Sequence, residues 1–168
     1  WQWHANPNPA WYSLDKARPG HVRLYAYRNM TQSGNFYFVG NLLLQKFSAP
    51  AFSAVTRIDF RPAAVGDKSG LVVMGQEWGY LALYKTSDGV RIGAFKGRYE
   101  QYDDATEELA SVPAQLSSDD LYTYHLKVTV EQGGSYHFSY SLDGIEFEPI
   151  GDSLQAKAGV WIGAKVGL

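Results

Sequence analysis

A strict alternation of apolar and polar residues in the last third of the chain constrains its fold more than any other feature. Every second residue is apolar in segment 122–131, and segment 135–142 repeats the pattern after a Gly133-Gly134 pair. A period of two is typical of a β-strand that buries one face, and two such segments joined by glycines predict an antiparallel hairpin. Its apolar face comprises Tyr122, Tyr124, Leu126, Val128, Val130, Tyr136, Phe138, Tyr140 and Leu142.

Turn signals separate further short strands along the chain. Ser87-Asp88-Gly89 and Asp143-Gly144 supply residues that tolerate the positive φ values of tight hairpin turns. Residues 103–110 contain Glu and Ala but lack an apolar stripe, and Pro113 follows, so we expect a loop there with at most one helical turn. The remaining expected strands are 22–27, 41–46, 54–60, 70–75, 80–85, 90–96 and 159–167.

Nine or so short strands with glycine-, proline- and aspartate-rich breaks indicate an all-β sandwich or barrel. We expect a two-sheet antiparallel β-sandwich that spans residues 1–168 as a single domain, because the chain contains neither a repeat nor a low-complexity linker. The clearest strands place these residues in its core: Leu126, Val128, Phe138, Tyr140 and Ile162.

Composition excludes several classes of protein. The chain has 168 residues, of which 45% are apolar, and this is enough for a sizeable core. Its net charge of −2 argues against nucleic-acid binding, and no apolar run is long enough to span a membrane. The absence of cysteine excludes disulfides, zinc-thiolate sites and thiol catalysis but leaves the compartment open, whether extracellular, periplasmic or cytoplasmic.

The first twelve residues carry a dense set of aromatic and polar side chains. Flat indole faces can pack on the C–H face of a sugar, while amide and imidazole groups exchange hydrogen bonds with its hydroxyls. The residues that we assign to such a surface are Trp11, His4 and Asn6. The alternative is a loop, anchored by tryptophans, that closes one end of the sandwich.

A second aromatic cluster lies in the segment 75–80. Trp78 precedes an expected strand, so it either stands exposed at the mouth of the sheet as a sugar platform or caps the edge of the core. Glu77 is either an acceptor for sugar hydroxyls or a solvated turn carboxylate. Gln76 and Tyr80 complete this candidate carbohydrate-binding set.

Motifs for catalysis are missing from the sequence. Glycosidases need two carboxylates that flank the scissile bond, and no pair among the 17 acidic residues is distinguished by its spacing. The acidic end of segment 98–104 offers the oxygen ligands that calcium prefers, although without the spacing of an EF-hand. We therefore expect no catalytic residue, no metal other than such a structural calcium, and no cofactor.

Several segments resemble the C-terminal β-sandwich of family-43 glycoside hydrolases, chiefly β-xylosidases. The resemblance covers nearly the whole chain and rests on the segments WQWHANPNP, NLLLQ, GDKSGL, FSYSLDG and WIGAKVGL. It implies a concanavalin A-like fold of the jelly-roll type. One departure is His4-Ala5, which stands where the family typically has Asn-His, so the family histidine's role does not transfer directly.

The resemblance also implies a function. In these β-xylosidases and α-arabinofuranosidases, a separate five-bladed propeller carries the catalytic carboxylates, and the sandwich packs on it and helps to wall its pocket. The resemblance places Trp161 and Lys165 nearest that pocket, with xylo-oligosaccharides or xylan as ligand. It further implies one strand before Trp1 and one after Leu168, which we expect to be trimmed or supplied by another chain. The alternatives are an independent xylan-binding module and a purely structural interaction domain.

Overall fold

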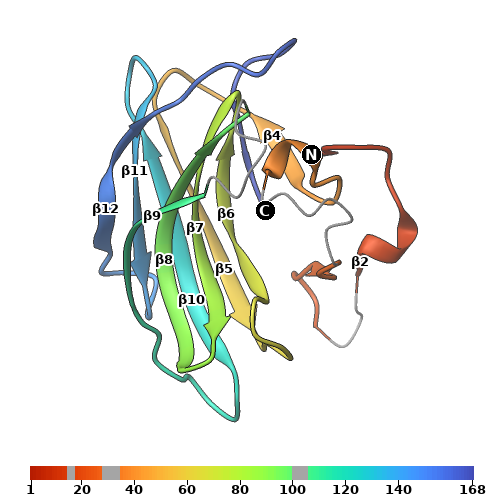
Figure 1. The fold of residues 1–168 in the computed structure, drawn as a ribbon, viewed down its shortest axis with the longest axis vertical. Coiled ribbons are helices and arrows are strands. Elements are labelled where there is room, and N and C mark those ends of the chain that lie inside the picture. The colour runs from red at the N-terminus through yellow and green to blue at the C-terminus, as the bar shows by residue number, and fades with distance from the viewer. Residues whose placement is uncertain (15–17, 28–34, 100–105) are drawn as a thin grey trace.

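Two antiparallel sheets form the body of the protein in a computed structural model that describes residues 1–14, 18–27, 35–99 and 106–168 (Figure 1). The larger sheet contains, in spatial order, β1 (Gln2–Trp3), β4 (Leu43–Lys46), β13 (Lys165–Gly167), β6 (Lys68–Met74), β7 (Glu77–Thr86), β8 (Gly89–Arg98) and β9 (Glu107–Pro113). The smaller sheet contains β12 (Glu148–Gln155), β11 (Ser135–Ser141), β10 (Tyr122–Val130) and β5 (Phe52–Phe60). The all-β sandwich predicted from the alternation is confirmed.

The predicted hairpin forms the centre of the smaller sheet. β10 pairs with β11, and Val128 lies opposite Phe138. Leu126, Val128 and Phe138 are fully buried between the two sheets, and Tyr140 packs at the edge of the same core. Ile162 does not belong to this core, because it lies in a loop and is 39% exposed.

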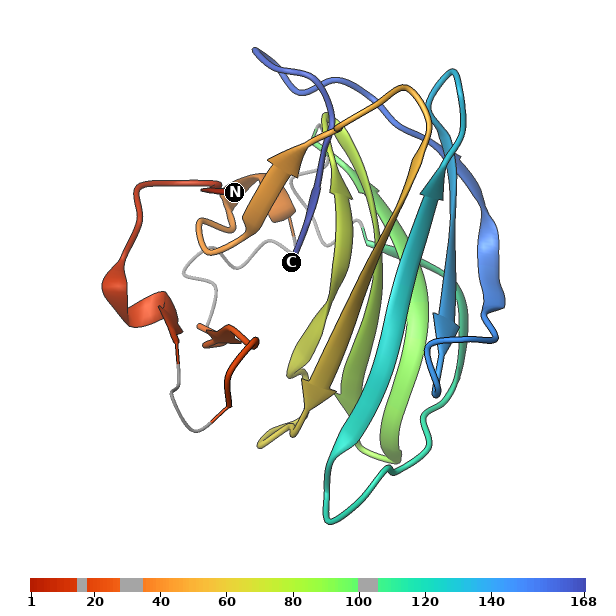
Figure 2. The same ribbon diagram turned by 180° about the vertical axis from the view of Figure 1, so that it is seen from behind.

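The larger sheet is buried on its outer face as well. Alternate residues of β7 point outward and join a second apolar cluster that η2 (Phe36–Phe38) partly covers. Residues 1–14 and 18–27 lie on the same side of the molecule as this helix and include η1 (Pro9–Trp11), β2 (Tyr12–Ser13) and β3 (Arg23–Leu24) (Figure 2). The described residues contain no helix that is long and apolar enough to cross a membrane.

Three expectations about local structure are wrong. Residues 107–113 form the edge strand β9, whose Leu109 and Val112 pack on the core although the segment has no regular alternation. In segment 159–167 only Lys165–Gly167 is a strand, because the preceding glycines allow the chain to bend. Asp143-Gly144 begins a longer connection between β11 and β12, in which the Asp143 carboxylate accepts hydrogen bonds from two backbone N–H groups.

Candidate functional site

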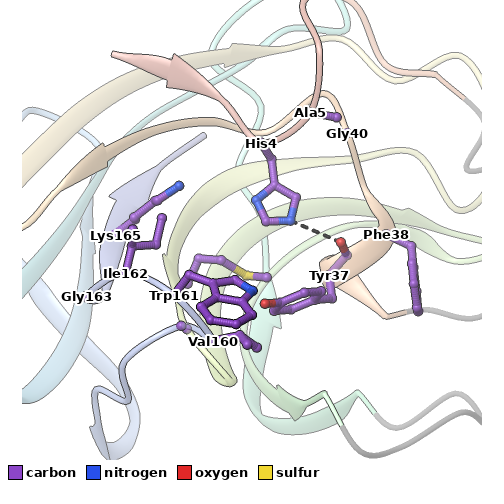
Figure 3. A pocket seen from close by; sticks show the side chains of 13 residues that line it. His4, Ala5, Tyr37, Phe38, Gly40, Val160, Trp161, Ile162, Gly163 and Lys165 are labelled. Carbon is purple, nitrogen blue, oxygen red and sulfur yellow. Dashed lines mark hydrogen bonds between the residues drawn. The ribbon is translucent and has the colours of Figure 1, made fainter.

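A pocket of about 380 Å3 lies between the N-terminal segment, η2 and the segment that crosses from β12 to β13 (Figure 3). It brings together His4, nominated from the N-terminal segment, with Trp161 and Lys165, which the family resemblance nominated. The other lining residues are Ala5, Tyr37, Phe38, Gly40, Met74, Gly75, Gly159, Val160, Ile162 and Gly163. Most of these residues are apolar, and the polar side chains at the pocket include the imidazole of His4, the amine of Lys165 and the phenol of Tyr37.

Two backbone hydrogen bonds and one side-chain hydrogen bond fix His4 in this pocket. Its backbone N–H donates to the carbonyl of Leu42, and its Nε2–H donates to the carbonyl of Tyr37 at 3.0 Å (Figure 3). The neighbouring Ala5 N–H donates to the carbonyl of Gly40. Because a carbonyl only accepts, Nε2 carries the proton, and the lone pair of the buried Nδ1 has no hydrogen-bond partner among the described residues.

The imidazole of His4 stays neutral near physiological pH. Burial lowers its pKa, and this effect outweighs the opposing hydrogen bond to Tyr37, while the charge of Lys165 lowers the pKa further. His4 can therefore accept a hydrogen bond through Nδ1 but carries no charge with which to attract an anion. Its ring also packs edge-on against Tyr37 with centroids 5.7 Å apart.

Lys165 is the first residue of β13 and is only 7% exposed. In the sheet it lies opposite Met74 of β6 on one side and Lys46 of β4 on the other. Burial lowers the pKa of Lys165, and the charge of Lys46 lowers it further. Lys165 is the one lysine or arginine among the described residues that line this pocket.

Trp161 lies at the rim of the pocket and is 91% exposed (Figure 3). The segment that carries it is fixed on its N-terminal side, where the N–H of Gln76 donates to the carbonyl of Ala158 at 3.0 Å. On its C-terminal side, the N–H of Phe47 donates to the carbonyl of Ala164. The indole is therefore presented to solvent by a short segment with both ends bonded to the larger sheet.

The candidate residues of the second predicted cluster, which lie in segment 76–80, do not line this pocket. Trp78 is 2% exposed and stacks on Phe36 with centroids 6.1 Å apart, so the expectation that it stands exposed as a sugar platform is wrong. Tyr80 is also buried and stacks on Phe36 and on Phe95. Both side chains point outward from β7 into the second apolar cluster, which η2 partly covers. Gln76 and Glu77 are exposed in and beside the β6–β7 turn.

Trp11 and Asn6 lie outside the pocket. Trp11 is half-buried, because its ring packs edge-on against Trp3 with centroids 5.4 Å apart and also lies over Gly40. Asn6 is exposed. Their assignment to a sugar-binding surface stays a prediction, and the anchored loop that we weighed against it agrees with the packing of Trp11.

Two lining residues, Tyr37 and Phe38, were not anticipated from the sequence. They belong to η2, whose first N–H groups are capped by Asn35, and the Asn35 Oδ1 accepts from the N–H of Tyr37 at 2.9 Å. An asparagine before three consecutive aromatic residues was the available signal for this turn.

The pocket lacks the groups that hydrolysis of a glycosidic bond requires. None of its described lining residues is an aspartate or a glutamate, whereas glycosidases use a carboxylate pair. Within ranges 1–14, 18–27, 35–99 and 106–168, no three His, Asp or Glu side chains are grouped to hold a metal ion. Of the segment considered for calcium, residues 100–104 lie outside the described part of the chain.

Solved structures match the fold over almost the whole chain. A "Bifunctional GH43-CE" from Bacteroides eggerthii is 26% identical with a TM-score of 0.81, and the match covers 99% of this chain and 20% of that one. A GH43 glycoside hydrolase, engineered to display both endo-xylanase and exo-arabinofuranosidase activity, is 18% identical with a TM-score of 0.82 over 98% and 33%. A GH43_12 protein retrieved from a capybara gut metagenome is 24% identical with a TM-score of 0.71 over 96% and 30%. The present chain thus spans a third or less of each matched protein. No curated protein matches it in sequence.

The family described as the β-xylosidase C-terminal concanavalin A-like domain of glycoside hydrolase family 43 matches residues 1–168. The chain belongs to this family. The resemblance drawn from the sequence motifs is therefore confirmed, as is the concanavalin A-like sandwich. The chain corresponds to the C-terminal domain of these enzymes and does not contain their catalytic domain.

Proposed function

We propose that this domain is a non-catalytic accessory sandwich that packs on the catalytic propeller of a family-43 glycoside hydrolase and supplies part of its substrate pocket through Trp161. The observation that carries the proposal is the exposure of Trp161 on a segment bonded to the sheet at both ends. Binding residues are commonly placed on loops that a rigid scaffold positions, and this segment has that arrangement.

Burial of the exposed Trp161 indole by a partner would be energetically favourable. An aromatic side chain buries about 150–250 Å2, which at about 25 cal/mol per Å2 amounts to roughly 4–6 kcal/mol when the partner covers it completely. Val160 and Ile162 on either side of Trp161 are also exposed. Three consecutive exposed apolar residues beside a pocket form a small apolar patch, and such a patch is typical of an interface or a ligand groove.

The activity named for one relative supports a substrate class for the parent enzyme. One matched structure is named for endo-xylanase and exo-arabinofuranosidase activity, so we propose xylan-derived oligosaccharides for the parent enzyme. In the assembled enzyme the indole of Trp161 would pack on the C–H face of a pentose. His4 lines the same pocket and is the polar residue that we propose to lie nearest this sugar.

A kinetic comparison in the two-domain enzyme tests this role. With the chain joined to its catalytic domain, Trp161→Ala should lower kcat/KM on xylobiose about tenfold, which corresponds to about 1.4 kcal/mol. Ile145→Ala is the matched control, because Ile145 is also apolar and exposed but lies in the β11–β12 connection. Both variants should unfold at the temperature of the parent. Equal kcat/KM for the parent and Trp161→Ala would contradict the proposal.

An independent xylan-binding module is the second candidate. It is favoured by exposed aromatic side chains in the N-terminal segment, among them Trp1, Tyr12, Tyr25 and Tyr27. Titration of the isolated chain with insoluble xylan distinguishes the two roles, because a binding module should retain xylan affinity without the propeller. The isolated chain should in either case release no product from aryl xylosides or arabinosides.

A further inference from the structure

Two lysines lie directly opposite each other on neighbouring strands of the larger sheet, namely Lys165 of β13 and Lys46 of β4. They are on the outer face of this sheet, because Met74, which lies opposite Lys165 on the other side, belongs to the second apolar cluster. Neither lysine forms an ion pair with an acidic residue in the described part of the chain. Like charges at directly opposite positions destabilise a sheet, so a nearby anion would stabilise this arrangement.

The two lysines differ in their access to solvent. Lys46 is exposed, whereas Lys165 is only 7% exposed and lines the pocket beside Trp161. Burial and the charge of Lys46 both lower the pKa of Lys165, whereas a neighbouring carboxylate would raise it. The described residues therefore supply no counter-charge for Lys165.

Lys165 and Trp161 belong to one short stretch of chain and line one pocket (Figure 3). Trp161 lies at the rim of this pocket, and Val160 and Ile162 beside it are also exposed. A surface that covers this apolar patch also covers the mouth of the pocket. It would then remove the small solvent exposure that Lys165 retains.

Loss of that solvent has a different cost for a charged and for a neutral amine. An amine with an ordinary pKa of 10.5 is charged at neutral pH unless its surroundings bring the pKa below about 7. Discharging it in this way would weaken docking about a thousandfold, because each pH unit corresponds to a factor of ten. A charged amine that is covered without a partner is also strongly unfavourable. An acidic side chain on the covering surface avoids both penalties.

We propose that Lys165 forms an ion pair with an aspartate or glutamate of the catalytic domain when that domain covers Trp161. This inference rests on the contact proposed above and adds the chemistry of the partner surface, which is apolar around one carboxylate. Burial of the apolar patch would supply most of the attraction. The ion pair would fix the position of the Trp161 segment on its partner, since charge complementarity gives an interface its specificity.

Lys165→Met tests this proposal, because it removes the charge and keeps an unbranched side chain. In the isolated chain it relieves the repulsion from Lys46, so the variant should unfold at or above the temperature of the parent. In the chain joined to its catalytic domain it leaves the partner carboxylate unpaired. Protection of Trp161 from hydroxyl-radical oxidation in the joined enzyme should then fall about thirtyfold or more.

Two controls separate charge from packing. Lys165→Arg keeps the charge, and Lys46→Met removes only the exposed neighbouring charge, so both should retain the protection of Trp161 within about threefold. Should Lys165→Met not fold, Lys165→Gln provides the same comparison.

Trp161 that is protected in joined Lys165→Met as well as in the joined parent would overturn the proposal and leave the contact with the catalytic domain in place. The same result, together with a rise in the Tm of the isolated parent in sodium acetate that is missing in Lys165→Met, would assign the site to a free carboxylate. Trp161 that is unprotected in the joined parent would overturn the contact and this proposal with it.

Discussion

Gly75 should be among the least replaceable residues of the domain, because it holds the Trp161 segment against the larger sheet. A Cβ at residue 75 would lie 2.8 Å from the carbonyl carbon of Lys157 and closer still to its oxygen. Ordinary contact begins at about 3.4 Å, so the backbone of Lys157 would have to retreat by more than half an ångström. The adjacent hydrogen bond from Gln76 to Ala158 would then be stretched or lost.

The cost of Gly75→Ala follows from these contacts. Overpacking against backbone costs about 1–3 kcal/mol, and a lost hydrogen bond adds about 0.5–1.5 kcal/mol. For a domain of this size each kcal/mol corresponds to a fall in Tm of about 2–4 °C, so we expect a decrease of roughly 3–18 °C. Thermal unfolding followed by circular dichroism measures this shift.

Gly163→Ala is the matched control for this prediction. Gly163 lies in the same crossing segment and lines the same pocket, but a Cβ there would meet no atom within 4 Å. This variant should unfold within about 2 °C of the parent, since surface changes usually stay within about 0.5 kcal/mol. If Gly75→Ala and Gly163→Ala unfold at the same temperature, the contact between the β6–β7 turn and the Trp161 segment does not hold the segment as argued.

Two further predictions concern pH and the core. Because burial lowers the pKa of His4 below its unfolded value of 6.5, the free energy of unfolding should decrease as pH falls below about 6.5, by up to about 1.4 kcal/mol per pH unit. His4→Asn should flatten this decrease in urea titrations, and an equal decrease in the parent and in His4→Asn would contradict it. Leu126→Ala should lower the free energy of unfolding by about 2–5 kcal/mol in urea titrations, because Leu126 is fully buried. The exposed Leu116→Ala should lower it by less than about 0.5 kcal/mol, and equal losses in the two variants would refute the assignment of the core.

The central strands were predictable because their environment is regular. In β10 one face contacts the core and the other contacts solvent. The alternation of apolar and polar residues therefore predicts both the strand and its buried face. β9 was not predicted because it is an edge strand, and its pairing with β8 shifts register between Ala94 and Phe95. This shift interrupts the period of two in its sequence. Edge strands with bulges carry less sequence signal than strands at the centre of a sheet.

The candidate site was predictable only in pieces. His4 was nominated from local sequence, and Trp161 and Lys165 from the family resemblance. Because 157 positions separate His4 from Trp161, only the sheet order, which places β4 next to β13, brings them together. Trp78 was misjudged because its exposure depends on whether η2 covers the outer face of the larger sheet. No local pattern around Trp78 reports on a covering segment some 40 positions earlier in the chain.

The accessory role of the Trp161 segment can be tested most directly by hydroxyl-radical footprinting of the chain alone and of the chain joined to its catalytic domain. In the isolated chain Trp161 should be oxidised readily because it is almost fully exposed, and Trp78 should be protected because it is buried. In the joined enzyme we predict strong protection of Trp161, while Trp78 stays protected and the exposed Ile145 reacts as before. Equal oxidation of Trp161 in the two proteins would contradict the claim that this segment meets the catalytic domain.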